Sequence, residues 1–210
     1  MKLYDTPWAP SPRRVRIFLA EKGVEVPREE IDLRKGQQFA DDYLGINPRG
    51  AVPALELDDG EVLCESAAIC RYFEALYPDP PLFGNTPLEI GRIESWTRRI
   101  EGDGYAAVVY VLRNTVGAFR DRAIPHAALS IAQIPELAAR GTIMWDGFIA
   151  GLDQRLAERE WIATDAYSFA DITALITVDF AKIAKLQVPD RLVHLHRWHA
   201  AASARPSAAA

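Results

Sequence analysis

Cysteine is scarce in this chain of 210 residues, which contains only Cys64 and Cys70. Two cysteines cannot build the dense disulfide framework that holds small secreted domains together. No run of about 18 apolar residues occurs, which is the length that a membrane-spanning helix needs. Charged Lys2 and Asp5 bracket a very short apolar stretch at the start, so we expect no signal peptide. These absences predict a soluble, cytoplasmic protein with no membrane partner.

Basic residues are not in excess either. The chain has 24 lysines and arginines against 29 aspartates and glutamates, a formal net charge of -5. Proteins that bind nucleic acid usually carry a basic surface, so no nucleic-acid partner is expected. The content of 49% hydrophobic and 25% charged residues is that of an ordinary globular protein, and the length is ample for a core.

The first 78 residues alternate between short apolar runs and helical patterns. The expected elements are a strand at Lys2–Tyr4, a helix ending at Gly23, a strand at Ile31–Leu33, a helix at Phe39–Leu44, a hairpin of Ala54–Leu57 and Val62–Cys64, and a helix after Glu65. Gly23 is a plausible helix stop, and Asp58–Gly60 is a typical hairpin turn. This β-α-β then α-β-β-α order is the thioredoxin-like pattern, here without a Cys-x-x-Cys.

Two serines stand where helices are expected to begin. Ser11 is predicted as an N-cap with Pro12 as the first helical residue, and Ser66 is predicted as a second N-cap. Helical spacing predicts that Val15, Phe18, Leu19 and Lys22 share one face of the first helix. It also predicts that the second helix buries Ile69, Phe73, Leu76 and Tyr77.

The rest of the chain predicts an all-helical domain. We expect domains at residues 1–78 and 88–210, joined by a proline-rich linker at 79–87. The expected helical segments include Ile93, Trp96 and Ile100, a largely apolar stretch at Tyr105–Phe119, loop with a short helix at 124–134, and helices from Pro135 through Leu156, at 168–185 and at 189–202, before a frayed end at 207–210. Gly102 and Gly104 predict a kink or a close approach of another surface.

Three features around Pro53 and Glu65 point to one kind of ligand. Pro53 cannot donate to a sheet, so it leaves the backbone groups of Val52 directed away from the strand. The helix that begins at Ser66 offers an N-terminus to a carboxylate, and Glu65 offers a counter-charge to an ammonium group. Together they suit a zwitterionic, peptide-like ligand.

Four stretches carry a resemblance to a known family. Residues Asn47–Leu55, Glu65–Ile69, Ser11–Gly23 and Tyr167–Ile172 resemble, in order and spacing, the cytosolic glutathione S-transferases, with the bacterial serine-, nu- and theta-like classes left open. The resemblance implies a thioredoxin-like glutathione-binding domain followed by an all-helical domain. It also implies glutathione as co-substrate, no metal, and a homodimer.

The resemblance also assigns residues to parts of glutathione. Val52 would pair its backbone N–H and C=O with the cysteinyl part, next to a cis Val52–Pro53 bond. Glu65 and Ser66 would hold the γ-glutamyl end. Gln38 and Phe39 lie where members of the family contact the glycyl end.

Activation of the glutathione thiol needs a hydrogen-bond donor and a positive local field, because a free thiol has a pKa near ~8.5 and is mostly protonated at neutral pH. Ser11 is the catalytic candidate. The serine of theta- and tau-like members falls on Ala9, whereas Ser11 falls where some nu-type members carry an asparagine. Either Ser11 activates the thiol from a loop of altered geometry, or activation relies on backbone amides. Tyr4 is predicted to be core, and Asp5 occupies the position of the tyrosine that other classes use.

Several other patterns have a structural and a functional interpretation. Arg13, Arg14 and Arg16 open a helix, where cations oppose the dipole, so acidic neighbours or an anionic ligand are expected. Ser168 and Asp171 form a capping box and are assigned to folding. The C-terminal histidines are not expected to bind metal; they are His194, His196 and His199. The residues that would either wall an apolar substrate pocket between the domains or simply pack in the core are Trp8, Tyr105, Val108, Tyr110 and Leu112.

Three functions follow as hypotheses. The first is a glutathione transferase that directs the thiolate at a hydrophobic electrophile, a detoxification reaction. The second is a glutathione-dependent disulfide reductase, which the nu-like position of Ser11 favours. The third is a non-catalytic binding protein, which the loss of the usual serine to Ala9 motivates.

Overall fold

The computed structural model describes residues 1–124 and 129–210. Its contacts divide these residues into two units, one built mainly from Met1–Pro80 and the other from Pro81–Ala123 and Ile131–Ala209. Each unit has its own elements and is described by itself.

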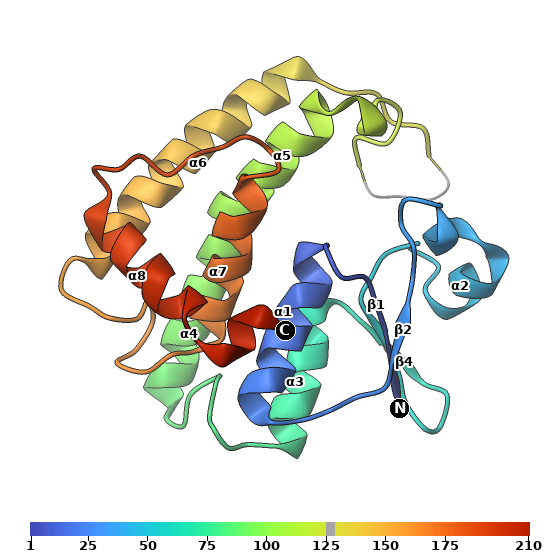
Figure 1. Cartoon of the computed structure of the whole chain (residues 1–210), viewed down its shortest axis with the longest axis horizontal. Coiled ribbons are helices and arrows are strands. Elements are labelled where there is room, and N and C mark those ends of the chain that lie inside the picture. Colours follow the sequence, from blue (N-terminus) through green and yellow to red (C-terminus); the bar gives the residue numbers. More distant parts are fainter. Residues whose placement is uncertain (125–128) are drawn as a thin grey trace. The chain divides into compact units, whose positions relative to one another are not determined.

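The first unit contains a four-stranded sheet in the order β2-β1-β3-β4 among the described residues. The strands are β1 (Lys2–Asp5), β2 (Arg28–Glu30), β3 (Ala54–Glu56) and β4 (Val62–Cys64). Strand β1 runs parallel to β2 and antiparallel to β3, with Leu3 opposite Leu55, and β3 pairs with β4 as the predicted hairpin. Figure 1 shows α1 (Pro10–Lys22) and α3 (Ser66–Leu76) on one face of this sheet and α2 (Asp41–Ile46) on the other.

The second strand lies three residues earlier than predicted. The prediction followed the apolar alternation of Ile31–Leu33, but the strand is the exposed Arg28–Glu30. It pairs with β1 through its backbone and through the ion pairs Lys2–Glu29 and Arg28–Asp5. Ile31 follows the strand and enters the core, and Asp32 then turns the chain by accepting hydrogen bonds from the next backbone amides. A strand held by its main chain at a sheet edge needs no apolar pattern.

Helix α1 also begins earlier than predicted. Pro10 is its first residue, and the carbonyl of Ala9 accepts the first helical hydrogen bond from Arg13 at 3.2 Å, so Ala9 rather than Ser11 is the N-cap. The fixed φ of a proline suits the first helical position, which explains the shift from Pro12 to Pro10. The predicted stop is confirmed, because Gly23 ends the helix at φ 64°. The four residues predicted to share a face are all buried: Val15, Phe18, Leu19 and Lys22.

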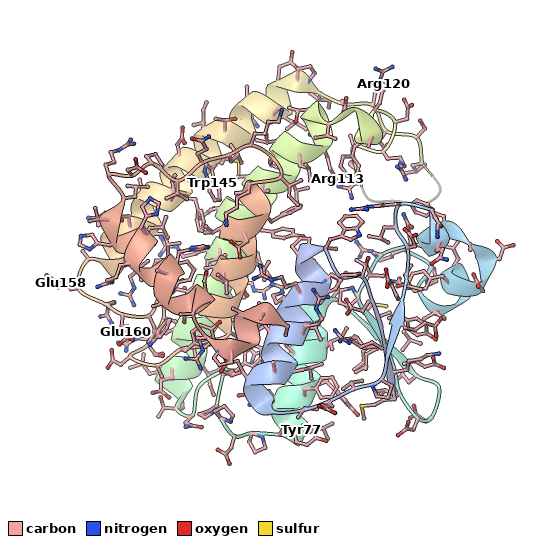
Figure 2. The ribbon with its side chains drawn as sticks, in the orientation of Figure 1. Tyr77, Arg113, Arg120, Trp145, Glu158 and Glu160 are labelled. Atoms are coloured by element: carbon pink, nitrogen blue, oxygen red, sulfur yellow. The ribbon has the colours of Figure 1, made fainter. Side chains whose placement is uncertain are left out.

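The cap of α3 is likewise displaced by one residue. Glu65 is the N-cap, at φ 70°, and Ser66 is the first helical residue. Ile69 and Phe73 are buried as predicted, but Leu76 and Tyr77 are exposed at the end of the helix, where Figure 2 labels Tyr77.

Buried Lys22 ties together the ends of α1 and α3. Its ammonium pairs with Glu74 at 2.5 Å and donates to the carbonyls of Pro78 and Pro80. The side chain is 0% exposed. The lysine therefore fixes the segment by which the chain leaves this unit.

The predicted helix at Phe39–Leu44 is divided in two. A 3-10 turn covers Gln37–Phe39, and α2 follows at Asp41–Ile46. Ala40 between them is extended, at φ -73° and ψ 148°, so one continuous helix cannot form.

The second unit is mainly helical. Its elements are α4 (Pro87–Arg99), a π-helical segment (Ile100–Tyr105), α5 (Ala106–Thr115), a 3-10 turn (Gly117–Phe119), α6 (Pro135–Leu156), α7 (Phe169–Ala181), α8 (Val193–Ser203) and a 3-10 turn (Pro206–Ala209). Helix α7 is buried along most of its length, and Trp145 of α6 is also buried (Figure 2). Figure 1 shows α5 and α6 side by side, which their extensive contacts confirm.

The two glycines between α4 and α5 mark the predicted irregularity. The helix widens into a π-helical turn over Ile100–Tyr105. A Cβ on Gly104 would lie 2.6 Å from the ring of Phe148, whereas one on Gly102 would meet nothing within 4 Å. The prediction of a close approach is confirmed at Gly104.

The ends of three predicted segments differ from the structure. Helix α7 stops at Ala181, before Lys185 adopts φ 60°, and α8 begins only at Val193. The expected frayed terminus is instead a 3-10 turn with Ser207 buried. The short helix expected within residues 124–134 lies partly outside the described residues, and residues 129–134 contain no helix.

Candidate functional site

The main chain of Val52 is the centre of the candidate site. Val52 precedes Pro53 across a cis peptide bond, as the resemblance implies, and Ala54 then enters β3. Within residues 1–124 and 129–210, neither the N–H nor the C=O of Val52 has a hydrogen-bond partner. Both groups can therefore pair with an extended peptide.

Two side chains hold the loop before Val52 in place. The carbonyl of Ala51 accepts hydrogen bonds from the hydroxyl of Tyr43 at 2.6 Å and from Nδ2 of Asn47 at 2.7 Å. Burial raises the pKa of Tyr43, so this phenol stays protonated and remains a donor. Asn47 also turns the chain by accepting from the amide of Arg49. Sequence reasoning missed these two residues as supports of the site.

The turn that carries Gln38 and Phe39 touches the same loop. Gly50 has φ 58°, and a Cβ there would lie 2.9 Å from the ring of Phe39 and 3.0 Å from the carbonyl of Gln38. The side chain of Gln38 is buried, and its Oε1 has no hydrogen-bond partner in the described structure. The structure thus brings both predicted residues beside the Val52 loop.

The start of α3 presents unpaired donors. No side chain caps this helix, and the amides of Ser66, Ala67 and Ala68 have no acceptor among the residues that the structure describes. Glu65 is exposed and forms an ion pair with Arg49 at 3.5 Å. An anion at this helix end would gain both hydrogen bonds and the favourable end of the helix dipole.

The side chain of Ser66 is held by hydrogen bonds from a buried cation on α1. Arg14 of α1 donates two hydrogen bonds to the Oγ of Ser66, from Nε at 3.1 Å and from Nη2 at 2.7 Å. Both side chains are buried. Nothing in the sequence pattern indicated that these residues meet, because they are 52 positions apart.

Ser11 lies in the first turn of α1 and is half-buried. It stands between Pro10 and Pro12, which have no N–H, so Ser11 is the only residue of the first three in α1 with a backbone amide. The two alternatives for thiol activation, a hydroxyl or a backbone amide, therefore both lead to Ser11 in this turn. Trp8, in the loop before it, is exposed and lies under the guanidinium of Arg34 at 5.5 Å.

A buried ion pair supports this loop. Arg16 donates to Asp5 at 2.6 Å and to the carbonyls of Thr6 and Pro7 at 3.0 Å and 2.8 Å. Asp5 is thus the acidic neighbour that the arginine pattern predicted, and it serves as a support and not as a proton donor. Tyr4 is buried as predicted, with its hydroxyl bonded to Glu56.

The remaining pocket candidates belong to the helical unit. Tyr105 is half-buried and stacks on Phe180 at 5.6 Å. Val108 and Leu112 are buried, as in the core-packing alternative, whereas Tyr110 is exposed. Of these residues, Tyr105 and Tyr110 alone keep surface with which to contact a ligand.

The capping box at α7 is confirmed. Asp171 accepts hydrogen bonds from the amide and hydroxyl of Ser168, from the amide of Ile162 and from the indole of Trp198. The pKa of Asp171 is raised to about 6, because the effect of burial exceeds the opposing effect of these hydrogen bonds. The motif links three segments of the helical unit.

Other candidate groups show no catalytic arrangement. The described residues contain no cluster of three or more potential metal ligands, and His199 pairs with Asp179 at 2.9 Å. Both cysteines are free, and burial raises the pKa of each thiol, which disfavours the reactive thiolate.

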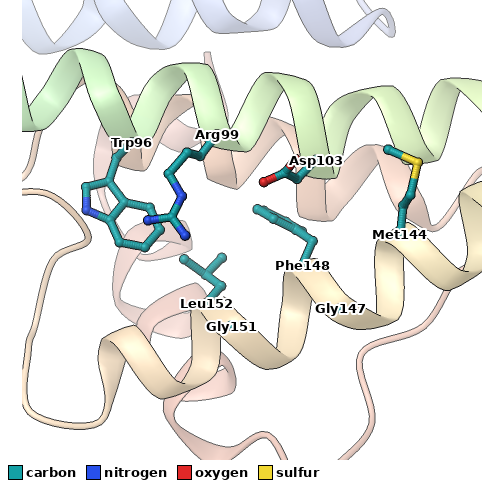
Figure 3. A pocket seen from close by; sticks show the side chains of 8 residues that line it. All are labelled: Trp96, Arg99, Asp103, Met144, Gly147, Phe148, Gly151 and Leu152. Carbon is teal, nitrogen blue, oxygen red and sulfur yellow. The ribbon is translucent and has the colours of Figure 1, made fainter.

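A shallow cavity of about 240 Å³ lies between two helices of the second unit (Figure 3). Its lining residues are Trp96, Arg99, Asp103, Met144, Gly147, Phe148, Gly151 and Leu152. The guanidinium of Arg99 lies over the ring of Trp96 at 4.6 Å. The lining thus combines apolar side chains with the charged groups of Arg99 and Asp103.

The order of elements is that of a thioredoxin-like domain followed by an all-helical domain. Family models support it: the glutathione S-transferase N-terminal domain matches residues 8–76, and the glutathione S-transferase C-terminal domain matches residues 148–206.

Individual relatives agree over the whole length. Glutathione S-transferase 2 of Saccharomyces cerevisiae is 37% identical, over 99% of this chain and 87% of that protein. The crystal structure of a glutathione S-transferase domain-containing protein from Marinobacter aquaeolei has a TM-score of 0.89 at 35% identity and covers 99% of both chains. A class Gtt2 glutathione S-transferase of Vibrio parahaemolyticus has a TM-score of 0.82 at 37% identity, over 99% of this chain and 95% of that one.

The chain belongs to the glutathione S-transferase family. The predictions of this family, of its two-part fold and of a glutathione transferase enzyme are confirmed. None of the helices in the described parts of the chain has the length and hydropathy to span a bilayer.

Proposed function

We propose that the first unit binds glutathione along the Val52 loop and the start of α3. The observation that carries this proposal is the unpaired N–H and C=O of Val52 beside the uncapped N-terminus of α3. The cysteinyl part pairs with Val52, and the γ-glutamyl carboxylate meets the amides at Ser66. Glu65 attracts the γ-glutamyl ammonium group, and Gln38 and Phe39 contact the glycyl end.

The chemical step is conjugation. Beside Ser11 the thiol of glutathione releases its proton to solvent, and the start of α1 together with a hydrogen-bond donor stabilises the thiolate that forms. The thiolate then forms a carbon–sulfur bond to a hydrophobic electrophile, and the leaving group departs with the electron pair of the broken bond. Trp8, Tyr105 and Tyr110 are the residues proposed to contact the electrophile, and Val108 and Leu112 pack in the core of the second unit.

Calorimetry with glutathione and turnover of an activated aryl chloride test the proposal together. Val52→Ala keeps the main chain and should bind glutathione within about threefold of the wild type, whereas Val52→Pro removes the N–H and should weaken binding by about 10-fold or more. Absence of heat and of thermal stabilisation by glutathione in the wild type would refute the site.

A second reaction at the same site is the reduction of a small mixed disulfide. The position of Ser11, two residues beyond Ala9, favours it. Faster turnover of a glutathione mixed disulfide than of any aryl or alkyl electrophile would make reduction the main activity. Binding of glutathione with neither reaction would leave a non-catalytic binding protein.

A homodimer and a cytoplasmic detoxification role complete the proposal. The cavity lined by α4, the π-helical segment and α6 is the surface proposed to contact a second copy, through Trp96, Met144 and Leu152. Light scattering during size-exclusion chromatography measures the mass directly. A monomer at micromolar concentration would contradict the dimer without affecting the glutathione site.

A further inference from the structure

We propose that Arg14 is a positioning residue for glutathione, because it aims the hydroxyl of Ser66 at the γ-glutamyl carboxylate and adds positive charge there. This inference rests on the proposed function, since it concerns how the same site holds its ligand. Arg14 does not touch the ligand; it acts through Ser66.

The first argument is the hydrogen-bond geometry. A serine hydroxyl has two acceptor lone pairs and one proton. Nε and Nη2 of Arg14 approach Oγ at 3.1 Å and 2.7 Å, so both lone pairs are used. The hydroxyl proton must then point away from Arg14, and it has no acceptor in residues 1–124 or 129–210.

The second argument is electrostatic. Arg14 and Ser66 are 9% and 3% exposed, so the guanidinium charge acts in a poorly solvated region. It lies at the start of α3, which is already the positive end of a helix dipole. A carboxylate bound at the same helix end is attracted both by this charge and by the helix dipole. The arrangement therefore favours a ligand with an anionic group at this point.

The third argument separates Arg14 from its neighbours. Arg16, two residues later, points at Asp5 and at the carbonyls of the preceding loop. Arg14 instead reaches α3 and contacts the one side chain proposed to bind the ligand carboxylate. The three arginines of α1 are thus not equivalent, although the sequence presents them together.

The competing explanation is that Arg14 only stabilises the packing of α1 against α3. A double-mutant cycle distinguishes this structural role from a role in positioning the ligand. The variants are Arg14→Lys, Ser66→Ala and the double variant, with Arg13→Lys as the matched control on the same helix turn. The probes are glutathione and its analogue in which the γ-glutamyl α-carboxylate is a carboxamide. Calorimetry gives Kd, and steady-state kinetics with saturating aryl chloride separate KM from kcat.

We expect Arg14→Lys and Ser66→Ala each to raise the Kd of glutathione by about 10-fold, because a point charge cannot reproduce the forked contact. The double variant should bind no more weakly than Ser66→Ala alone, since Arg14 acts through Ser66. KM for glutathione should rise while kcat stays within about twofold. Kd for the carboxamide analogue should change by less than about twofold in Arg14→Lys.

Three results would overturn the inference: an unchanged Kd in Arg14→Lys, a multiplicative loss in the double variant, or an equal loss for both ligands. If Arg14→Lys does not fold, Arg14→Gln takes its place in the comparison of the two ligands alone, because it also removes the charge, and an equal loss for both ligands would again overturn the inference. A wild-type protein that binds no glutathione would instead refute the proposed function, so the two failures are distinguishable.

Discussion

Ser11 shows how one residue position decides the chemistry of a site. The sequence predicted a serine that caps α1, but Pro10 takes the first helical position and Ala9 becomes the cap. The hydroxyl of Ser11 is therefore not required by the helix as a cap. This separates its proposed role in catalysis from the capping of α1.

Replacing Ser11 with alanine tests that separation. If the hydroxyl stabilises the thiolate, Ser11→Ala should lower kcat/KM by about 10-fold to 100-fold near neutral pH and raise the pKa of the bound thiol. The free energy of unfolding should not show the loss of about 1 kcal/mol that removal of an N-cap causes, because Ala9 caps the helix. Ultraviolet titration of the bound thiolate and urea unfolding measure the two effects. An unchanged thiol pKa, with Ser11→Thr as the control that keeps a hydroxyl, would assign activation to the backbone amide.

Asp171 predicts a specific pH dependence. Burial raises its pKa in the folded protein to about 6, above the usual value of an aspartate. Between about pH 4 and pH 6 the folded protein holds a proton that the unfolded chain has lost, so this group's contribution to stability falls as the pH rises, by at most about 1.4 kcal/mol per pH unit. Above about pH 6 both states are ionised and the contribution is constant.

Unfolding in urea at a series of pH values checks this dependence. Asp171→Asn should remove that pH-dependent term and be less stable at neutral pH by about 1–3 kcal/mol, because an amide cannot accept all the hydrogen bonds. Ser168→Ala keeps the carboxyl and should keep the slope. The same slope in Asp171→Asn as in the wild type would contradict the assignment.

At the scale of elements, the sequence predicted those whose cause lies in their own residues. The capping box of Ser168 and Asp171, the stop at Gly23 and the hairpin of β3 and β4 each carry their signal locally, and all three are present. Strand β2 carries none, because β1 imposes it through backbone pairing. The break at Ala40 also has no clear local signal.

The site divides in the same way. Proline at 53 and the start of a helix near Ser66 could be read directly from the sequence. The supports at Arg14 and Tyr43 could not, because their partners are distant in the chain or are carbonyl groups that any residue possesses. Supporting contacts of this kind become visible only when the elements are assembled.

The π-helical segment offers a matched pair of glycines. Gly104→Ala should destabilise the protein by about 1–3 kcal/mol, because the new Cβ would lie 2.6 Å from the ring of Phe148, which must move. Gly102→Ala has open space and should be neutral or stabilising by up to about 1 kcal/mol. Thermal or urea unfolding measures both. Equal effects would show that helix propensity, and not the contact with Phe148, sets the conformation here.

Two tyrosines of the first unit test the support of the Val52 loop. Tyr43→Phe removes one of two donors to the carbonyl of Ala51 and should cost about 1 kcal/mol of stability and several-fold in the Kd of glutathione. Tyr4→Phe removes a comparable hydroxyl, bonded to Glu56 away from that loop, and should leave the Kd unchanged. Calorimetry distinguishes them. An equal loss of binding in both variants would point to a general loosening of the unit.

On the scale of the whole molecule, the sequence predicts the fold and the family of both units well, but it predicts the substrate of the enzyme only in part. The motifs that identify the family are distributed along both halves, so fold and family follow from them. Substrate choice depends on which apolar side chains remain exposed, and burial of Val108 and Leu112 but not of Tyr110 was not readable from spacing alone.

The buried ammonium of Lys22 can be used to measure how often the first unit unfolds locally, because a reagent in solution cannot reach it in the folded state. Amine-reactive reagents should modify Lys35 and Lys182 at once, since their side chains are 77% and 67% exposed, and should reach Lys22 only when the first unit opens. Mass spectrometry of acetylated peptides over time would follow this, and glutathione should slow the modification of Lys22 alone. Rapid acetylation of Lys22 in the native protein would contradict its enclosure. The rate at which this one lysine is acetylated thus gives the rate at which the proposed glutathione-binding unit opens.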